Sequence, residues 1–267
     1  MSISHKKLDL SKEKIESLDV FIKKEIHNEQ NKAILHARYS DESDRHQIYL
    51  ESVPNLKSFQ ETISIETGII VHLIRSSLDN SVFERALLFT RGNIAKPKNI
   101  QFAIFDSEVK FNRNTMIDEM SQRDKDVIRS YQPFLGSAGR PDSYSGPYIH
   151  QLSHLQDLSN TDKHRSVVDV TVDPNSFEMN TITSPIMDAW SVWTRENPKQ
   201  YFENFTPVEM KPGAVAFEAY VENYNIAMPC FAGFGIACVA LDERRPIIPT
   251  LQRIESFARL VINDLYS

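Results

Sequence analysis

The chain has 267 residues, 41% hydrophobic and 25% charged, which is enough for one large core and ordinary for a globular protein. Only eight glycines are present, which argues against a linker-rich or glycine-loop protein. The formal net charge of −6 argues against a protein that coats nucleic acid non-specifically, although an acidic body can still carry a small basic site.

Cysteine usage and the N-terminus bear on the cellular compartment. Cys230 and Cys238 both lie in the apolar run 229–241, and their spacing fits neither a CxxC redox pair nor a zinc knuckle. Residues 1–7 have no apolar segment after their lysines, so they do not form a signal peptide. No apolar run approaches the roughly 20 residues that span a bilayer. We therefore expect a cytoplasmic protein with buried thiols and no membrane partner.

The first elements alternate between helix and strand. A helix is predicted after Ser11, which can cap it, because apolar residues recur there at helical spacing. Residues 32–39 and 46–53 are typical of strands, and the polar residues 40–44 between them indicate a hairpin turn.

A long helical pattern begins after Pro54 and continues past Asn80. It is nearly apolar over residues 69–78, so we expect it to be a central buried helix. Residues 101–105 form a short apolar run that predicts an isolated strand or an extended plug.

Short helices are predicted within 115–131, followed by a loop rich in Gly, Ser and Pro at 133–146. Pro147 is a favourable first residue for the next helix, which carries leucines on one side and ends in the polar run 159–165.

After Arg165 the apolar period changes to two, as in Val168, Val170 and Val172. Residues 214–222 and 227–241 predict a further antiparallel pair, and Pro249 opens a last amphipathic helix. The predicted fold class is α+β, in which a helical front, with the long central helix and the N-terminal β-hairpin, precedes a C-terminal antiparallel sheet and a closing helix. No linker is evident, so we predict one domain over residues 1–267.

The densest polar cluster lies where an apolar helix ends and a strand is predicted to begin. Within it, His164 can exchange a proton near neutral pH, and Lys163 and Arg165 can hold a phosphate, while Asp162 or Asn160 can fix the histidine tautomer. Such a set suits metal-independent acid–base cleavage of a phosphodiester. The alternative is structural, because basic residues at a helix C-terminus offset the helix dipole.

A second cluster interrupts the apolar part of the central helix. Arg75 and Asp79 are four residues apart and therefore share a helical face. A buried charge is costly unless it is paired, so Arg75 either pairs with Asp79 or points to another group such as Asp162. An internal salt bridge and a functional site are both consistent with this spacing.

A metal site is a third interpretation. His150 and His154 are four apart on one predicted helix, a spacing that can chelate zinc, with Asp157 nearby. No HExxH arrangement surrounds them, so a solvated helical face with two histidines is the preferred interpretation. We expect no metal and no other cofactor.

The absence of glycine-rich and nucleophile motifs argues against three large enzyme classes. The sequence contains no GxSxG, GxxxxGK[ST] or GxGxxG motif, and therefore gives no indication of an α/β-hydrolase, a P-loop NTPase or a Rossmann enzyme.

Four segments together resemble a widespread, largely uncharacterised family of bacterial proteins with RSALDH-like and LxNxDKHR motifs. The matching segments are 73–80, 101–105, 132–134 and 155–165. The RSALDH pattern is in turn similar to the Rx4-6H motif of HEPN-type helical ribonucleases and toxins, in which Arg and His cleave RNA across a dimer interface. Here Arg75 matches the arginine, but Asn80 stands where the histidine would be.

The resemblance implies a HEPN-like nucleic-acid-processing protein, a metal-independent ribonuclease in bacterial defence or stress, with RNA or a nucleotide as partner and a homodimer as assembly. Our own inference, beyond the family pattern, is that His164 comes from a different segment than Arg75 and supplies the missing imidazole as acid and base, with Arg75, Lys163 and Arg165 on the phosphate. Asp79, Asn160 and Asp162 would orient these groups. The alternative is a non-catalytic scaffold or binding module in which the DKHR cluster is a structural polar network.

Overall fold

The computed structural model describes residues 2–26, 33–41, 45–52, 57–136, 150–162, 168–172, 212–213, 215–219, 230–232, 234–238 and 245–267. These residues group into two compact units. The first contains Met1–Asp19, Thr62–Val167 and Cys238–Ser267, and the second contains Val20–Glu61 and Val168–Ala237. The single domain proposed from the sequence stays a prediction.

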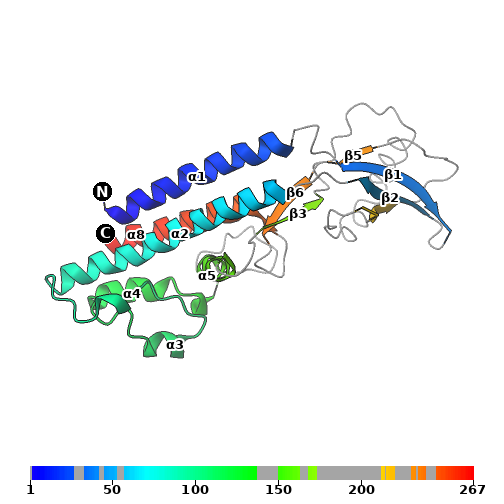
Figure 1. The fold of residues 1–267 in the computed structure, drawn as a ribbon. Coiled ribbons are helices and arrows are strands. Elements are labelled where there is room, and N and C mark those ends of the chain that lie inside the picture. The colour runs from blue at the N-terminus through cyan, green and yellow to red at the C-terminus, as the bar shows by residue number, and fades with distance from the viewer. Residues whose placement is uncertain are drawn as a thin grey trace. The chain divides into compact units, whose positions relative to one another are not determined.

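Helices make up most of the first unit (Figure 1). The long helices are α1 (Ile3–Ile26), α2 (Lys57–Phe89) and α8 (Ile247–Tyr266), and the shorter ones are α3 (Glu108–Arg113), α4 (Gln122–Ser130) and α5 (Gln151–Asp162). Two 3-10 turns, η2 (Pro97–Asn99) and η3 (Pro133–Leu135), lie in the connections. None of the helices in the described ranges is both long and apolar enough to cross a membrane.

The strands pair with one another through their backbones. β1 (Ala33–Ser40) and β2 (Arg45–Ser52) pair antiparallel, at the positions where the sequence predicted a hairpin. β4 (Val215–Ala219) and β5 (Cys230–Ala232) flank them in the order β4–β2–β1–β5. β3 (Val168–Val172) and β6 (Phe234–Cys238) are neighbours in a smaller sheet, and β7 (Arg245–Pro246) directly precedes α8.

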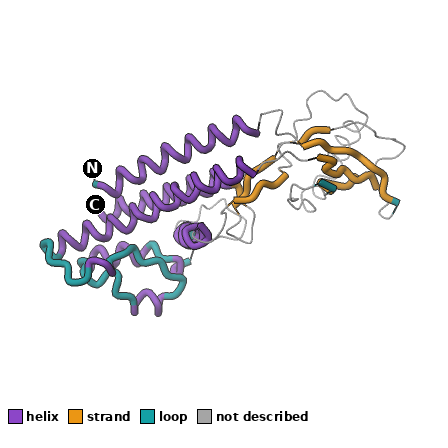
Figure 2. Tube along the Cα trace, viewed as in Figure 1, coloured by secondary structure: helices purple, strands orange, loops and turns teal. Residues whose placement is uncertain are grey.

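The predicted α+β fold is wrong for the part of the chain whose side chains are described. In that part no residue lies in a strand. Helices dominate it, and Figure 2 draws them in purple and the strands, of which only the backbone is described, in orange. The buried apolar side chains belong to the helices and to the loops between them. The closing helix α8 packs against α4 and α5. The period-two pattern thus predicted backbone pairing but did not predict which elements build this core.

Helical spacing explains the core of the first unit. On α2 one stripe of fully buried positions recurs every three to four residues, at Ile63, Thr67, Ile70, Ile74, Leu78, Val82 and Ala86. On α8 they include Leu251, Ile254, Ala258, Val261 and Leu265. The central buried helix predicted from the sequence is therefore confirmed as α2.

The N-terminal helix begins earlier than predicted. Ser11 is buried within α1, and its hydroxyl donates to the Leu8 carbonyl at 2.8 Å, so it does not cap the helix. The Lys7 ammonium donates to the Ser76 hydroxyl of α2 at 3.2 Å, and Arg259 of α8 forms an ion pair with Asp9 at 2.9 Å. These bonds place α1 beside both α2 and α8, as Figure 1 also shows.

A buried carboxylate ties α4 to α2. The Asp124 side chain is 1% exposed and accepts hydrogen bonds from Arg85 Nε and Nη2 at 3.1 and 3.0 Å. It also accepts from Ser121 Oγ at 2.8 Å and Arg123 Nη1 at 3.1 Å. Burial by itself raises the pKa of Asp124, but these bonds outweigh burial and hold the pKa below its usual value. Arg123 also donates to the Leu265 carbonyl, one of the free carbonyls that end α8.

Candidate functional site

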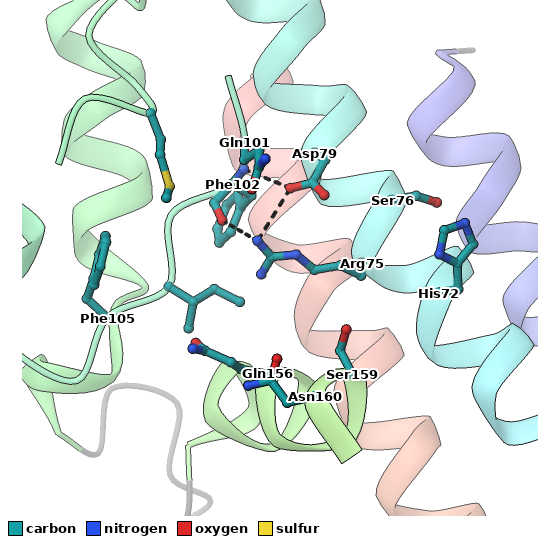
Figure 3. A pocket seen from close by; sticks show the side chains of 12 residues that line it. His72, Arg75, Ser76, Asp79, Gln101, Phe102, Phe105, Gln156, Ser159 and Asn160 are labelled. Atoms are coloured by element: carbon teal, nitrogen blue, oxygen red, sulfur yellow. Dashed lines mark hydrogen bonds and ion pairs between the residues drawn. The ribbon is translucent and has the colours of Figure 1, made fainter. Parts of the chain in front are cut away.

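The segment 101–105 is extended, but it is not part of a sheet. Side chains of α2, and not a neighbouring strand, form hydrogen bonds with its backbone. The Phe102 amide donates to Asp79 Oδ1 at 2.8 Å, and Arg75 Nη2 donates to the Phe102 carbonyl at 2.8 Å (Figure 3). Arg75 and Asp79 also form an ion pair at 3.6 Å. We call this arrangement of Arg75, Asp79 and the Phe102 backbone the Phe102 clamp.

A buried glutamine holds the same segment further along. The Gln132 side chain donates through Nε2 to the Ala103 carbonyl at 2.8 Å and accepts from the Phe105 amide at Oε1 at 2.9 Å. Gln132 is 0% exposed, and Nε2 also donates to the Ile128 carbonyl at 3.1 Å. Buried backbone groups need partners, and the side chains of Arg75, Asp79 and Gln132 together satisfy four backbone groups of the segment. The extended plug predicted from the sequence is thus held by specific side-chain bonds.

A pocket of about 450 Å³ opens beside the clamp. α2 contributes His72, Arg75, Ser76 and Asp79, and α5 contributes Gln156, Ser159 and Asn160. The remaining lining comes from the extended segment, at Gln101, Phe102, Ile104 and Phe105, and from Met116. Figure 3 shows the Arg75 guanidinium reaching from α2 toward the segment, with the polar side chains of α5 facing it. We call this cavity the Arg75 pocket.

The Arg75 guanidinium is only partly engaged. Its side chain is 23% exposed, and its bonds to Phe102 and Asp79 both use Nη2. Guanidinium carries five N–H donors, and within the described part of the chain Nε and Nη1 have no hydrogen-bond partner. The pocket therefore offers a guanidinium with free donors, which lies beside the Asp79 carboxylate and faces neutral amides and hydroxyls.

A second pocket of about 440 Å³ lies next to the first, because the two share Ile104, Phe105 and Gln156. Its other lining includes Asp106, Lys110, Pro133, Ser153 and Asp157. Lys110 pairs with Asp106 at 3.3 Å. Burial raises the pKa of the Asp157 carboxyl. We call this cavity the Asp157 pocket.

Three of the predicted site residues come together, namely Arg75, Asp79 and Asn160, which all line the Arg75 pocket. Asp162 is the last residue of α5, and only its backbone is described. The predicted residues Lys163, His164 and Arg165 lie outside the described residues.

The sequence reasoning missed several residues that line the pocket. His72 and Ser76 lie on the same face of α2 as Arg75 and Asp79, a face that helical spacing from Arg75 could have indicated. Gln101 and Gln156 are polar positions beside apolar runs and carry no motif, so sequence spacing alone gave no signal for them.

His154 of α5 and His150, which directly precedes α5, are buried, so the predicted solvated histidine face is wrong. His150 and His154 are 6% and 2% exposed. His150 Nδ1 accepts a hydrogen bond from the Leu152 amide at the start of α5, and its ring meets Phe257 edge-on at 5.0 Å between centroids. Burial lowers the pKa of His150 to about 4. Over the described ranges, no group of three or more His, Cys, Asp or Glu residues could hold a metal ion.

Comparison with protein-family models, curated proteins and solved structures finds no match to this chain. The resemblance to the bacterial family and to HEPN-type ribonucleases therefore stays a prediction. Three of the four segments that carry the resemblance are joined by hydrogen bonds in the structure, namely 73–80, 101–105 and 132–134. The fourth segment, 155–165, contributes Gln156, Ser159 and Asn160 to the Arg75 pocket.

Proposed function

We propose that the Arg75 pocket binds the phosphodiester of an RNA strand and that the chain is a HEPN-like, metal-independent ribonuclease of the bacterial cytoplasm. The observation that supports this proposal is the partly engaged Arg75 guanidinium, which lines a pocket with neutral amides and has donors left for phosphate oxygens. The pocket volume of about 450 Å³ lies within the range of about 300–1,000 Å³ that is usual for ligand sites.

The proposed chemistry needs one proton shuttle and cations on the phosphate. His164 accepts the proton of the ribose 2′-hydroxyl as that oxygen attacks phosphorus, and the bond from phosphorus to the 5′-oxygen breaks. The resulting imidazolium returns the proton to the leaving 5′-oxygen, which leaves a 2′,3′-cyclic phosphate. Arg75, Lys163 and Arg165 offset the charge that grows on the non-bridging oxygens. A homodimer, as in the ribonucleases that the motif resembles, is part of the proposal.

The second candidate function is a binding module without catalysis. The Phe102 clamp supports it, because Arg75 and Asp79 both bond the protein backbone and thereby connect α2 to the extended segment. In that case Arg75 is a structural residue, and the pocket beside it holds a ligand that is not cleaved.

Cleavage of total bacterial RNA in EDTA by wild type and by the His164→Ala variant tests the first proposal. We expect the wild type to cleave and the variant to lose at least about a hundredfold in rate, as removal of a general acid–base does. Thermal melts of both proteins show whether the variant remains folded.

The Gln156→Ala variant separates the two candidates further. Gln156 lines the pocket from the exposed side of α5 and takes no part in the Phe102 clamp. The ribonuclease proposal predicts a raised KM for RNA with an unchanged melting temperature. RNA bound but never cleaved by the wild type would favour the binding module, and absence of both binding and cleavage would contradict both candidates.

A further inference from the structure

The Asp157 pocket differs in chemistry from the Arg75 pocket, although the two share the wall formed by Ile104, Phe105 and Gln156. In the Arg75 pocket the charged pair includes a cation with free donors. Among the described residues that line the Asp157 pocket, two are carboxylates, Asp106 and Asp157, and one is a cation, Lys110, which pairs with Asp106 at 3.3 Å. The Asp157 pocket therefore suits a group that donates hydrogen bonds, and it is a poor site for a second phosphate.

Asp157 is an acceptor that this pocket leaves available. It is an exposed residue of α5 at the pocket wall, and within the described part of the chain its carboxylate receives no hydrogen bond and forms no ion pair. Partial burial raises the pKa of this carboxyl. A carboxylate in such surroundings is stabilised by a ligand that offers two adjacent N–H donors, because each oxygen can then accept one bond.

Apolar surface for a flat ring lies beside this carboxylate. Phe105 and Pro133 both line the Asp157 pocket. Proteins that read single-stranded RNA commonly stack an unpaired base on an aromatic side chain and bond its Watson–Crick edge. Among the four RNA bases only guanine presents two adjacent donors, N1–H and N2–H, on that edge.

We infer that the Asp157 pocket is a base-recognition subsite for guanine, adjacent to the phosphodiester held by Arg75. This inference rests on the proposed RNA binding, and it names which base the RNA site prefers. The guanine ring lies against Phe105, and the Asp157 carboxylate accepts from N1–H and N2–H. Adenine offers an acceptor at N1, and uracil offers a single donor between two acceptors, so neither base satisfies both carboxylate oxygens.

Fluorescence anisotropy with short labelled oligouridylates tests the inference. The oligonucleotides carry a central guanosine, inosine or adenosine, and 2′-fluoro riboses prevent cleavage because they lack the attacking hydroxyl. Inosine keeps N1–H but lacks the N2 amino group, so it removes one charge-assisted bond. We expect guanosine to bind about tenfold more tightly than inosine and still more tightly than adenosine.

Two variants make the test specific. Asp157→Asn should abolish the difference between guanosine and inosine, since the amide has only one acceptor oxygen. Asp126→Asn is the matched control, because Asp126 is an exposed helical carboxylate of α4 that lines neither pocket, and it should keep the full difference.

The outcomes distinguish the inference from the function on which it rests. Binding of all three oligonucleotides with equal affinity by the wild type would overturn the guanine subsite and leave RNA binding intact. The subsite would also be refuted if Asp157→Asn kept the guanosine preference. Failure of the wild type to bind any of the oligonucleotides would overturn the inference and the proposed function together.

Discussion

Replacing Asp124 should destabilise the first unit more than replacing any exposed carboxylate. The side chain is 1% exposed and accepts four hydrogen bonds, three of them from arginine nitrogens. Loss of one partner of a buried, hydrogen-bonded charge pair costs about 3–5 kcal/mol. Arg85 is 23% exposed and can regain water, so we expect about 3 kcal/mol for Asp124→Ala.

The assay is urea unfolding at pH 7, with Asp126→Asn on the same helix as the control. The control should change the free energy of unfolding by less than about 0.5 kcal/mol, as exposed substitutions usually do. A loss below about 1 kcal/mol for Asp124→Ala would refute the reasoning that this carboxylate joins α2 and α4.

The direction of the pKa shift of Asp124 determines how its contribution to stability depends on pH. Its pKa in the folded protein is lowered below the usual 3.8, so its stabilising contribution is complete above pH 3.8. The contribution is lost as the pH falls below 3.8 through the folded-state pKa. The difference between wild type and Asp124→Ala should therefore be constant from pH 5 to 7 and shrink only in stronger acid.

Three further predictions concern single side chains. Gln132→Ala should cost about 1–3 kcal/mol in urea unfolding, because buried backbone groups of Ala103 and Phe105 lose their partner, and an unchanged midpoint would contradict the role of Gln132. Asp79→Ala should destabilise more than Asp79→Asn, since asparagine keeps an acceptor for the Phe102 amide, and equal losses would argue that only the charge of Asp79 matters. The drop in the pKa of His150 from 6.5 to about 4 means that the unfolded chain takes up the proton first, so stability should fall by about 3 kcal/mol between pH 6.5 and 4. His150→Leu should flatten that slope in melts across the same pH range, and a slope equal to that of the wild type would show that other groups cause it.

Local patterns in the sequence were sufficient for the elements whose apolar period is strong. The spacing that predicted the central helix corresponds to α2, and the closing helix was placed within two residues of its start at Ile247. The start of α1 was missed because Ser11 has the side chain of a capping residue, yet its hydroxyl bonds a carbonyl of its own helix.

Local sequence patterns could not predict the contacts between segments that are distant in the chain. The spacing of Arg75 and Asp79 left an ion pair and another partner for Arg75 as alternatives, and the ion pair is present. Nothing near them in sequence indicated that both also bond the Phe102 backbone. His150 and His154 were assigned to a solvated face because their spacing is compatible with one. Their burial depends on α8, whose Phe257 contacts His150 across more than a hundred residues of sequence.

Binding of single-stranded RNA to the wild type, Gln156→Ala and Asp126→Asn tests the central claim most directly, because Gln156 lines both pockets and lies outside the Phe102 clamp. Anisotropy titrations in EDTA at low salt, with melting curves for each protein, give the affinities and confirm folding. The account predicts that wild type and Asp126→Asn bind equally well and that Gln156→Ala binds several-fold more weakly with an unchanged melting temperature. Equal binding by all three proteins would contradict the assignment of these pockets as the RNA site.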